Sequence, residues 1–390
     1  MDSARVLYVI TQLELGGAQL TTLELLRRLN RRRYQLTLVT SPGGALEAEA
    51  RAIPGLDVWA LPSLARPVHP WRDAQAYREL TRFIRHCRFD LVHTHSSKAG
   101  ILGRWAAHRA GVPVICHTIH GFGFHAGQPG WVRRSFQAVE RATARITTRL
   151  IAVNRHDERV GLSAGIGRPE QYQRIPYGID PSRFHPNGLT PQGARAQLGL
   201  QPDAPTIGTV ACFKPQKAPE DFLAVCARLR ERVPNLQAVM VGDGALRPQI
   251  ERRRRALGLE SVVHLLGWRR EIPEILTALD VFVLTSRWEG LPVSVLEAQA
   301  MGVPVVVTDT GGVRDCLKHG VDGWMVPVGA VEAFSDGVAR LLRDPVTARR
   351  MAEEAQRRVR QQAGVERMVR ETEALYETVL RGRHTGGADE

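Results

Sequence analysis

The sequence has no apolar run that approaches the ~18 residues needed by a membrane-spanning helix. Its first residues, Met-Asp-Ser-Ala-Arg, lead directly into a short apolar segment and not into the longer hydrophobic region of a secretory signal. We therefore expect a cytoplasmic protein that is at most peripheral to the inner face of a membrane.

Cysteine and low-complexity sequence are both scarce. The cysteines are scattered and show no paired spacing: Cys87, Cys116, Cys212, Cys226 and Cys316. Neither a disulfide framework nor a zinc site is indicated by this pattern. The 390 residues are 43% hydrophobic and include seven tryptophans, which is enough for two buried cores in a globular chain.

Acidic residues are outnumbered by basic ones, 40 to 53, which gives a formal net charge of +13. Such a charge could attract nucleic acid, anionic lipid headgroups or phosphorylated substrates. Arginine runs such as 252–255 lie within or beside amphipathic helical patterns, so solvated helix faces are the simplest interpretation. An anionic membrane surface is the main alternative. No nucleic-acid partner is expected, because no recognised binding module accompanies the charge.

Short apolar segments alternate with helical patterns in two series, which is typical of βαβ repetition and parallel sheets. The first series has strands expected at 6–10, 36–40, 58–61, 91–93, 112–116 and 150–153. The second has strands expected at 206–211, 237–241, 262–265, 281–284, 305–308 and 324–326. A Gly, Pro and Asn cluster after residues 177–186 reads as a linker. We predict an α/β protein with two doubly wound domains, 1–185 and 186–364, facing across a cleft.

The stretch 286–302 lies between two of these apolar strands and reads as loop, helix and stop. Pro292 suits the first helical position, and Gly302 suits the end of the helix. The loop belongs at the carboxyl end of a parallel sheet, where open α/β folds bind ligands. Amides at this helix N-terminus, those of Leu291, Val293 and Ser294, favour phosphate oxygens.

Two carboxylates, Glu289 and Glu297, flank the same place. They indicate a ligand that combines phosphate with a polyhydroxylated group. Lys214 and Lys217 follow the first strand of the second domain at the same edge, where they could hold a diphosphate by charge-assisted hydrogen bonds. Solvated surface lysines are the alternative. Another strand is followed by a Trp-Arg pair that could cover a nucleotide base, although a packed core Trp is equally compatible: Trp268 and Arg269.

In the first domain, Gly16 and Gly17 open a helix after the first strand. The segment lacks the full G-x-G-x-x-G fingerprint, and no acidic residue closes a second strand about 20 residues later, so an NAD site is disfavoured. The glycines still allow the backbone to approach a ligand closely. A plain tight turn is the alternative.

Histidines gather at the ends of two neighbouring strands: His93, His95, His117, His120 and His125. Metal ligation is possible, but sites of this kind usually include a carboxylate or cysteine in a tighter set. Hydrogen-bonded cleft histidines are therefore favoured over metal ligands. His120 is the best functional candidate, because glycines on both sides of Phe122 indicate an irregular loop near a ligand. Its neutral imidazole can donate to a hydroxyl or accept from one.

These motifs together resemble the retaining glycosyltransferases of family 4, which have the GT-B fold of two Rossmann-like domains. The resemblance extends nearly end to end. Glu289 and Glu297 match the family's Glu-x7-Glu signature within Glu-Gly-Leu-Pro and Leu-Glu-Ala. Supporting matches are Gly16-Gly17, His120-Gly121, Pro215-Gln-Lys217, Gly242-Asp-Gly244 and Gly178-Ile-Asp180.

The resemblance implies a role for each matching position. Glu297 would bind the ribose of a sugar nucleotide, and Glu289 would contact hydroxyls of the transferred sugar. His120 would lie beside that sugar from the opposite domain. The diphosphate would be held by Lys217, by the loop at Gly17 and by the segment Gly290, Leu291, Pro292, Val293 and Ser294. A C-terminal helix at 365–382 would cross back to complete the first domain.

The expected reaction is transfer from a nucleotide-diphosphate sugar with retained anomeric configuration and no covalent enzyme intermediate. The family implies no cofactor and no metal ion, because protein cations replace the metal. We expect a UDP-sugar donor, which could carry an N-acetylhexosamine. The expected acceptor is a glycan or lipid-linked saccharide of cell-envelope assembly.

Two positions depart from the family pattern. Cys212 stands where many relatives have arginine, a charge that Lys214 could supply, and Tyr177 stands where relatives often carry asparagine. Three other functions stay open. A glycosidase would use the two glutamates as an acid and nucleophile pair, about 5 to 9 Å apart. A sugar-nucleotide epimerase would need no acceptor, and a non-catalytic basic binding protein would need no turnover.

Overall fold

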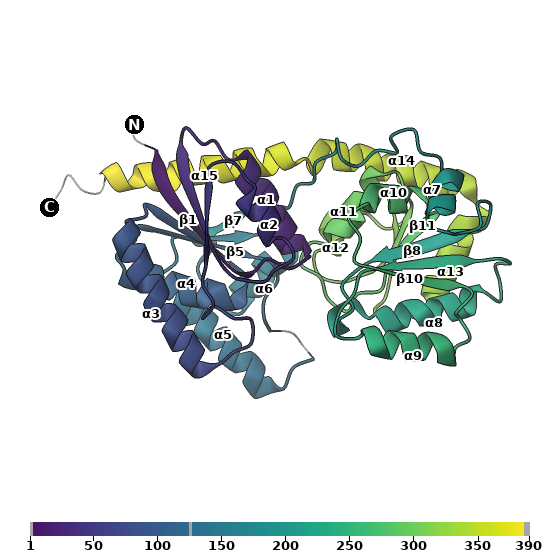
Figure 1. Ribbon diagram of the computed structural model, residues 1–390, viewed down its shortest axis with the longest axis horizontal. Helices are drawn as coiled ribbons and strands as arrows, with labels where there is room; N and C mark the ends of the chain where they lie inside the picture. Colours follow the sequence, from purple (N-terminus) through teal and green to yellow (C-terminus); the bar gives the residue numbers. More distant parts are fainter. Residues whose placement is uncertain (1–2, 125–126, 386–390) are drawn as a thin grey trace. The chain divides into compact units, whose positions relative to one another are not determined.

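The computed structural model describes residues 3–124 and 127–385. The chain forms two compact units. The first unit extends to Gly178 and resumes at Val365, and the second is Ile179–Gly364. The first crossing therefore lies at the start of residues 177–186, before the Gly, Pro and Asn cluster that reads as a linker. Each unit contains one parallel β-sheet flanked by helices (Figure 1). These sheets confirm the predicted α/β class.

The first unit has a seven-stranded sheet in the order β3-β2-β1-β4-β5-β6-β7, and all its strand pairs are parallel. The strands are β1 Ala4–Gln12, β2 Tyr34–Ser41, β3 Leu56–Ala60, β4 Leu91–His95, β5 Val114–Ile119, β6 Arg149–Ala152 and β7 Tyr172–Arg174. The helices are α1 Gly17–Arg28, α2 Glu47–Arg51, α3 Pro70–Cys87, α4 Ser97–Arg109, α5 Gly130–Ala144, α6 Arg155–Ser163 and α15 Val365–Thr385. Only β7 has no counterpart among the predicted strands.

Strand β1 is covered on both faces, as its unbroken apolar sequence predicts. Val6, Tyr8 and Ile10 pack in one core cluster with residues of α1 and α15. Leu7 and Val9 point the other way, into a cluster with residues of α3 and α4. The alternation follows from the two-residue period of a strand, so one strand contributes to two cores.

Helix α15 is an integral part of the first unit, as the resemblance implied. The hydroxyl of its buried residue Tyr376 lies 2.5 Å from the hydroxyl of Tyr8 and 2.5 Å from Nδ1 of His93. The apolar face of the helix joins the core cluster on β1 through Val365, Met368, Val369, Leu375, Tyr376 and Val379. The last helix therefore closes one face of a sheet whose strands lie almost 200 residues or more earlier in the chain.

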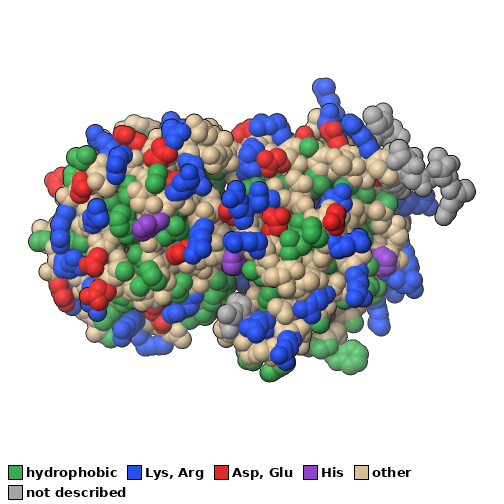
Figure 2. All heavy atoms as spheres, turned by 180° about the vertical axis from the view of Figure 1, so that it is seen from behind, with side chains coloured by type: hydrophobic (Ala, Val, Ile, Leu, Met, Phe, Trp, Pro, Cys, Tyr) green, Lys and Arg blue, Asp and Glu red, His purple; other side chains and the backbone are tan. Residues whose placement is uncertain are grey.

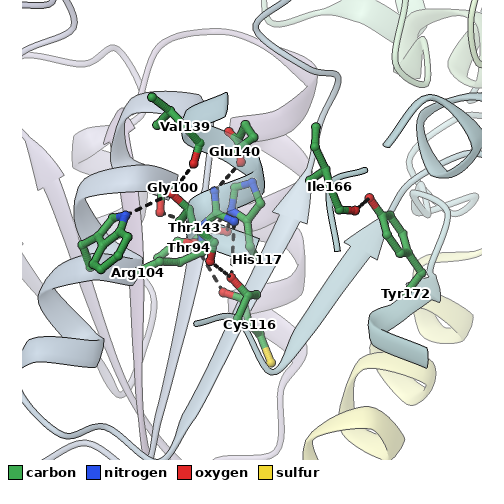
Figure 3. Close-up of polar contacts among 12 residues, drawn as sticks. Thr94, Gly100, Arg104, Cys116, His117, Val139, Glu140, Thr143, Ile166 and Tyr172 are labelled. Carbon is green, nitrogen blue, oxygen red and sulfur yellow. Dashed lines mark hydrogen bonds and ion pairs between the residues drawn. The ribbon is translucent and has the colours of Figure 1, made fainter. Parts of the chain in front are cut away.

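A charged pair is buried between α4 and α5. The guanidinium of Arg104 is fully buried and donates to Glu140 Oε2 at 2.7 Å and to the Gly100 carbonyl at 2.8 Å. His117 lies beside it and donates from Nδ1 to the Thr94 carbonyl at 3.1 Å. Figure 3 shows these residues gathered at one point. A Cβ at Gly100 would lie 2.5 Å from the His117 ring, so glycine is needed there for the packing.

The second unit has a six-stranded parallel sheet in the order β10-β9-β8-β11-β12-β13. The strands are β8 Thr206–Val210, β9 Gln237–Val241, β10 Val263–Gly267, β11 Val281–Leu284, β12 Val305–Thr308 and β13 Trp324–Val326. The helices are α7 Pro191–Gln197, α8 Pro219–Leu229, α9 Arg247–Ala256, α10 Ile272–Thr277, α11 Val293–Ala300, α12 Val313–Cys316, α13 Val331–Arg343 and α14 Pro345–Gln362. Each predicted strand of this series overlaps an observed one.

Basic side chains are spread out, and not gathered in one patch, on the face seen in Figure 2. Figure 2 shows Lys and Arg side chains spread over one face of the molecule, with Asp and Glu between them. Within the ranges that the structure describes, no helix is both long enough and apolar enough to cross a membrane.

Candidate functional site

The strand order of the second unit reverses between β8 and β11. The chain proceeds from β8 outward through β9 and β10, and then returns to place β11, β12 and β13 on the other side of β8. Loops at the carboxyl ends of two such strands diverge, and the space between them is where open α/β sheets bind ligands. The 211–218 loop follows β8, and the 285–292 loop follows β11.

The side chains of Lys217 and Glu289 meet at this switch point. Lys217 Nζ lies 2.5 Å from Glu289 Oε1, and Ser286 Oγ donates to the same oxygen at 2.5 Å. The side chain of Glu289 is 4% exposed and that of Lys217 is 16% exposed. An ammonium carries three donors and a carboxylate has two acceptor oxygens. The pair can therefore bind an anionic group through the cation and a hydroxyl through the carboxylate.

Main-chain carbonyls accept the hydrogen bonds that hold the two loops together. The amide of Arg287 donates to the Gln216 carbonyl at 2.8 Å, and Gln216 Nε2 donates to the Trp288 carbonyl at 2.9 Å. The hydroxyl of Thr285 donates to the Ala218 carbonyl at 3.0 Å. Ala218 has a left-handed backbone with φ of 44°, which is strained for a residue with a side chain. The position of Lys217 is thus fixed by contacts on both sides of its loop.

Ser286 and Gly311 belong to the site, and the sequence interpretation did not single them out. Ser286 orients the Glu289 carboxylate through the hydrogen bond described above. A Cβ at Gly311 would lie 2.0 Å from the Glu289 carbonyl oxygen, so only glycine allows this close approach. The Gly-Gly pair that follows β12 was the available signal for this contact.

Helix α11 starts at Val293, and Pro292 precedes it as the N-cap residue, which corrects the prediction that Pro292 is the first helical residue. The amides of Val295 and Leu296 donate to the Pro292 carbonyl. The amides of Val293 and Ser294 therefore precede the helical hydrogen-bond ladder, where a helix N-terminus can bind an anion. The loop residues Gly290 and Leu291 lead into this turn.

Glu297 lies one turn into α11 and is partly buried. Burial raises the pKa of its carboxyl to about 7, although the charge of Arg183 opposes this shift. A carboxyl with this pKa changes its charge near neutral pH. Ligand binding at this position can therefore depend on its ionisation.

The remaining predicted residues of this unit lie at the same sheet edge but at different distances from the pair. Lys214 is half-buried at the start of the Pro215–Lys217 turn, two residues after Cys212. Trp268 and Arg269 follow β10, two strands away from β8, and Trp268 is 46% exposed. At about 4.8 Å per strand, they lie roughly 10 Å from β8 along the edge. Because its side chain is nearly half exposed, Trp268 is not a core residue.

The first unit has its own switch point, between β1 and β4. Gly16 caps α1 after β1, and Gly17 is the first residue of that helix. The Thr11 hydroxyl lies 2.7 Å from the hydroxyl of Ser96, whose φ of 62° is unusual for a non-glycine residue. Gly16 and Gly17 therefore lie at the carboxyl edge of the sheet, near the end of β4.

His120 follows β5 and is joined to two residues that the sequence did not rank as functional. Its Nε2 lies 2.9 Å from Nδ1 of His95, at the end of β4, and its Nδ1 is hydrogen-bonded to the Tyr177 hydroxyl. His93 is bound instead to Tyr376 and Thr118, and His117 is packed beside Arg104. Each of the four described histidines has hydrogen-bond partners within the first unit.

Within residues 3–124 and 127–385, no three His, Cys, Asp or Glu side chains are grouped so that they could hold a metal ion. His125, the fifth histidine considered from the sequence, lies outside the described residues. Burial lowers the pKa of His93 to about 3, and it also lowers the pKa of His95, His117 and His120. These imidazoles are accordingly neutral.

Comparison with protein families gives one match for each unit. The profile described as "Glycosyl transferase 4-like domain" matches residues 16–178, and "Glycosyl transferases group 1" matches residues 192–358. The UDP-Gal:alpha-D-GlcNAc-diphosphoundecaprenol alpha-1,3-galactosyltransferase of Escherichia coli is 32% identical over 339 residues, covering 85% of this chain and 86% of that protein. A D-inositol 3-phosphate glycosyltransferase of Kribbella flavida is 27% identical over 373 residues, covering 87% and 85%.

Solved structures share the fold over nearly the whole chain. HepE of Anabaena, in complex with UDP and glucose, has a TM-score of 0.84 at 22% identity and covers 96% of this chain and 100% of that one. Sucrose-phosphate synthase of Thermosynechococcus elongatus has a TM-score of 0.84 at 21% identity, with 97% and 100% covered. These likenesses confirm the predicted GT-B fold of two Rossmann-like domains.

Proposed function

Because this chain belongs to the glycosyltransferases of group 1, we propose that it transfers a hexose or N-acetylhexosamine from a UDP-sugar to a glycan or a lipid-linked saccharide. The relative from Escherichia coli is named for a UDP-galactose donor and for an acceptor carried on diphosphoundecaprenol. Donor and acceptor of the same classes are proposed here. The product would serve the assembly of a cell-envelope polysaccharide or glycolipid.

The observation that carries the proposal is the buried pair of Lys217 and Glu289 at the switch point between β8 and β11. Lys217 Nζ gives one hydrogen bond to Glu289, and an ammonium has two further donors for diphosphate oxygens. Glu289 receives Lys217 and Ser286 on Oε1, so Oε2 can accept from a sugar hydroxyl. The cation and the acid would thus bind adjacent parts of one sugar diphosphate.

The other candidate residues would bind the rest of the donor. The amides of Val293 and Ser294 would meet the diphosphate at the N-terminus of α11, with Lys214 supplying a second cation. Glu297 would accept hydrogen bonds from the ribose. Trp268 and Arg269 lie farther along the sheet edge, where a base at the other end of the donor would be placed.

The reaction proposed is transfer with retained anomeric configuration and without a metal ion. As the bond between the anomeric carbon and the diphosphate breaks, negative charge grows on the leaving group. Lys217 and the amides of α11 would stabilise this charge in place of a divalent cation. The acceptor hydroxyl would attack from the face that the diphosphate leaves, with His120 beside the transferred sugar.

The proposal is tested by incubating the protein with UDP-, GDP- and ADP-sugars and saccharide or polyprenyl-diphosphate acceptors in the presence of a chelator. We expect release of UDP that depends on the acceptor, and an α-linked product from an α-linked donor. Inactivity with every donor, strict dependence on a metal ion, or conversion of the donor to its epimer without an acceptor would overturn the proposal.

Substitution of Lys217 checks the assigned role of the cation. Lys217→Met should lower kcat by about 10²- to 10³-fold, the usual effect of losing a group that stabilises charge in the transition state. Lys318→Met is the matched control, because Lys318 is exposed and lies outside the switch-point loops. Equal activity in the two variants would remove Lys217 from the mechanism.

We also propose that the protein contacts an anionic membrane surface through the first unit. Val68, Trp71 and Trp131 are 77%, 83% and 74% exposed, and we call these three residues the tryptophan rim. Val68 and Trp71 lie at the N-terminal end of α3, and Trp131 at that of α5. Helix α4 packs against both of these helices. Crossover helices run antiparallel to their strands, so their N-termini share one sheet edge.

The composition of the rim suits the interface of a bilayer. Tryptophan is enriched at the headgroup level because its ring is amphipathic. Arg72 and Arg134 are exposed beside the rim, and basic residues near an anionic surface contribute about 1 kcal/mol each. A lipid-linked acceptor would be reached from this position without a spanning helix.

Flotation with phosphatidylglycerol vesicles tests this contact. The double variant Trp71→Ala with Trp131→Ala should bind the vesicles at least about tenfold more weakly, since two large apolar side chains are lost from the interface. Val346→Ala is the control, because Val346 is 78% exposed in the second unit. An equal loss of vesicle binding in the double variant and in Val346→Ala would contradict the proposed surface, as would no binding by the wild type.

A further inference from the structure

A small pocket lies inside the first unit beside the His95–His120 pair, lined by apolar side chains and a few polar ones. Its volume is about 30 Å³, and its lining includes Thr22 of α1, His93 and His95 of β4, Thr118 of β5 and Thr372 of α15. A volume of this size has room for one water molecule or at most two. The pocket is therefore too small for a substrate but large enough for an ordered solvent molecule.

One residue that lines this pocket has a buried polar atom without a partner. His95 is 2% exposed, and its Nε2 makes no hydrogen bond to any described residue. A buried ring nitrogen without a partner costs free energy, because it has given up its hydrogen bond to water. Thr21, Thr118 and Thr372 line the same pocket, and each hydroxyl oxygen has a lone pair for a second hydrogen bond. A water molecule in the pocket could therefore bridge His95 Nε2 and a threonine hydroxyl.

The other nitrogen of His95 fixes the direction of its hydrogen bonds. Thr22 Oγ1 donates its proton to the Ala18 carbonyl at 2.7 Å, and it also lies 3.4 Å from His95 Nδ1. Since the threonine proton is already used, this second contact is favourable only when His95 Nδ1 carries the proton. The same Nδ1–H then donates to His120 Nε2 at 2.9 Å. His120 must therefore hold its own proton on Nδ1, which faces the Tyr177 hydroxyl.

We propose that an ordered water molecule in this pocket donates a hydrogen bond to His95 Nε2, and that His95 is a positioning residue that holds His120 as the Nδ1–H tautomer. The lone pair of His120 Nε2 is occupied by His95. His120 can therefore offer a ligand only its Nδ1–H, which would leave the Tyr177 hydroxyl and donate to the ligand instead. It acts as a hydrogen-bond donor to the sugar and not as a base that removes a proton.

The role beside the sugar rests on the proposed function, whereas the tautomers and the water rest on the geometry of the first unit alone. Burial lowers the pKa of both His95 and His120, which agrees with neutral rings linked by one proton. Tyr177, at the end of the chain Tyr177–His120–His95, is only 5% exposed.

Nitrogen-15 NMR of histidine-labelled protein reads the tautomers directly. In the full-length chain we expect Nδ1 protonated and Nε2 unprotonated in both His95 and His120. His95→Phe should release His120 into a mixture of tautomers, whereas His95→Asn, whose amide can replace Nδ1–H, should keep the Nδ1–H form. His108→Asn, at an exposed position on α4, is the control and should change neither signal.

Activity gives the second reading. His95→Phe should lower kcat about 10- to 100-fold with little change in the donor KM, because most of the proposed donor-binding groups lie in the second unit. His95→Asn should restore most of kcat. The proposal would be overturned if His120 were protonated on Nε2 in the wild type. It would also be overturned if the His120 tautomer were unchanged in His95→Phe.

The water is tested by a crystal structure at a resolution that shows ordered solvent. A density peak within hydrogen-bond distance of His95 Nε2 is expected, and a dry pocket would overturn this part. Should His95→Phe fail to fold, the wild-type spectrum and Thr22→Val decide the tautomer question. Thr22→Val removes the acceptor that biases Nδ1, so partial loss of the Nδ1–H form is expected. None of the spectra requires turnover, so failure of the transferase assay would leave these readings intact.

Discussion

Glu297 shows how one buried carboxyl can make ligand binding depend on pH. Burial raises its pKa to about 7, so the group is mostly neutral below pH 7 and mostly ionised above it. A neutral carboxyl has one donor and a weaker acceptor, whereas the carboxylate accepts on both oxygens. The proposed contact with ribose hydroxyls uses the carboxylate, and binding should therefore release a proton at pH 6 and none at pH 8.

From this ionisation we predict that affinity for a UDP-hexose rises about tenfold between pH 6 and pH 8, following the ionised fraction of Glu297. Calorimetric titration measures it. A UDP-hexose is preferred to UDP, because its esterified diphosphate does not titrate in this range. In Glu297→Gln the affinity should be lower and nearly independent of pH. An equal slope in the variant, or affinity that falls with rising pH, would contradict the assignment.

For the candidate site, the sequence singles out residue types but not their partners. Glu289 and Lys217 stand in loops after apolar strands, where chemistry-bearing residues are conspicuous. Ser286, His95 and Tyr177 gain their roles from contacts: one hydroxyl on a carboxylate, one ring against another, and one phenol on His120. Such contacts join residues that are up to 57 positions apart, and no local pattern encodes them.

Among the elements, apolar strands covered on both faces were predicted well because their composition differs sharply from that of the loops around them. Strand β7, Tyr172–Arg174, was missed. It has only three residues, two of them polar, and lies at the edge of the sheet beside β6. Its extended form depends on pairing with its neighbour, so tertiary contact and not local preference decides it.

Helices α4 and α5 illustrate the same difference for charge. Arg104 and Glu140 are charged residues on helices, yet their side chains are only 0% and 8% exposed. The pair closes the space above His117 and is completed by the Gly100 carbonyl and the Thr147 hydroxyl. A buried pair of this kind contributes little net stability, but either member alone would be a buried unpaired charge.

We predict that Arg104→Met destabilises the first unit by about 3–5 kcal/mol, because Glu140 keeps its charge without a partner. The double variant Arg104→Met with Glu140→Leu should recover most of that loss. Urea unfolding followed by circular dichroism measures both values. Arg109→Met, exposed on the same helix, is the control and should change the free energy of unfolding by less than about 0.5 kcal/mol. A double variant as unstable as the single one would show that the pair itself is stabilising.

For the whole molecule, the two units differ in how the chain builds them. The second unit is continuous, from Ile179 to Gly364, with its own core cluster. The first is discontinuous, and α15 brings six buried apolar or aromatic residues to it. At about 1.5–3 kcal/mol for each buried side chain, their loss amounts to on the order of 10 kcal/mol. That is comparable to the entire stability of a typical domain, about 5–15 kcal/mol.

The chain crosses between the units at two places that lie next to each other within the first unit. Arg367 Nη2 donates to the carbonyls of Pro176 and Tyr177, at 2.9 and 3.3 Å. The main chain just before Gly178 and that just after Val365 are therefore close together. The sequence predicted this return of the last helix only through the family resemblance, because a helical pattern does not reveal which sheet it covers.

From this construction we predict that fragment 179–364 folds alone with a cooperative urea transition, whereas fragment 1–178 does not. Joining residue 178 to residue 365 by a short glycine linker should restore cooperative unfolding to the first unit, because the two ends already lie side by side. The same fusion with Tyr376→Ala is the control and should be markedly less stable, since it removes the ring that contacts Tyr8 and His93. A cooperative transition in fragment 1–178 itself would mean that the core on β1 closes without α15.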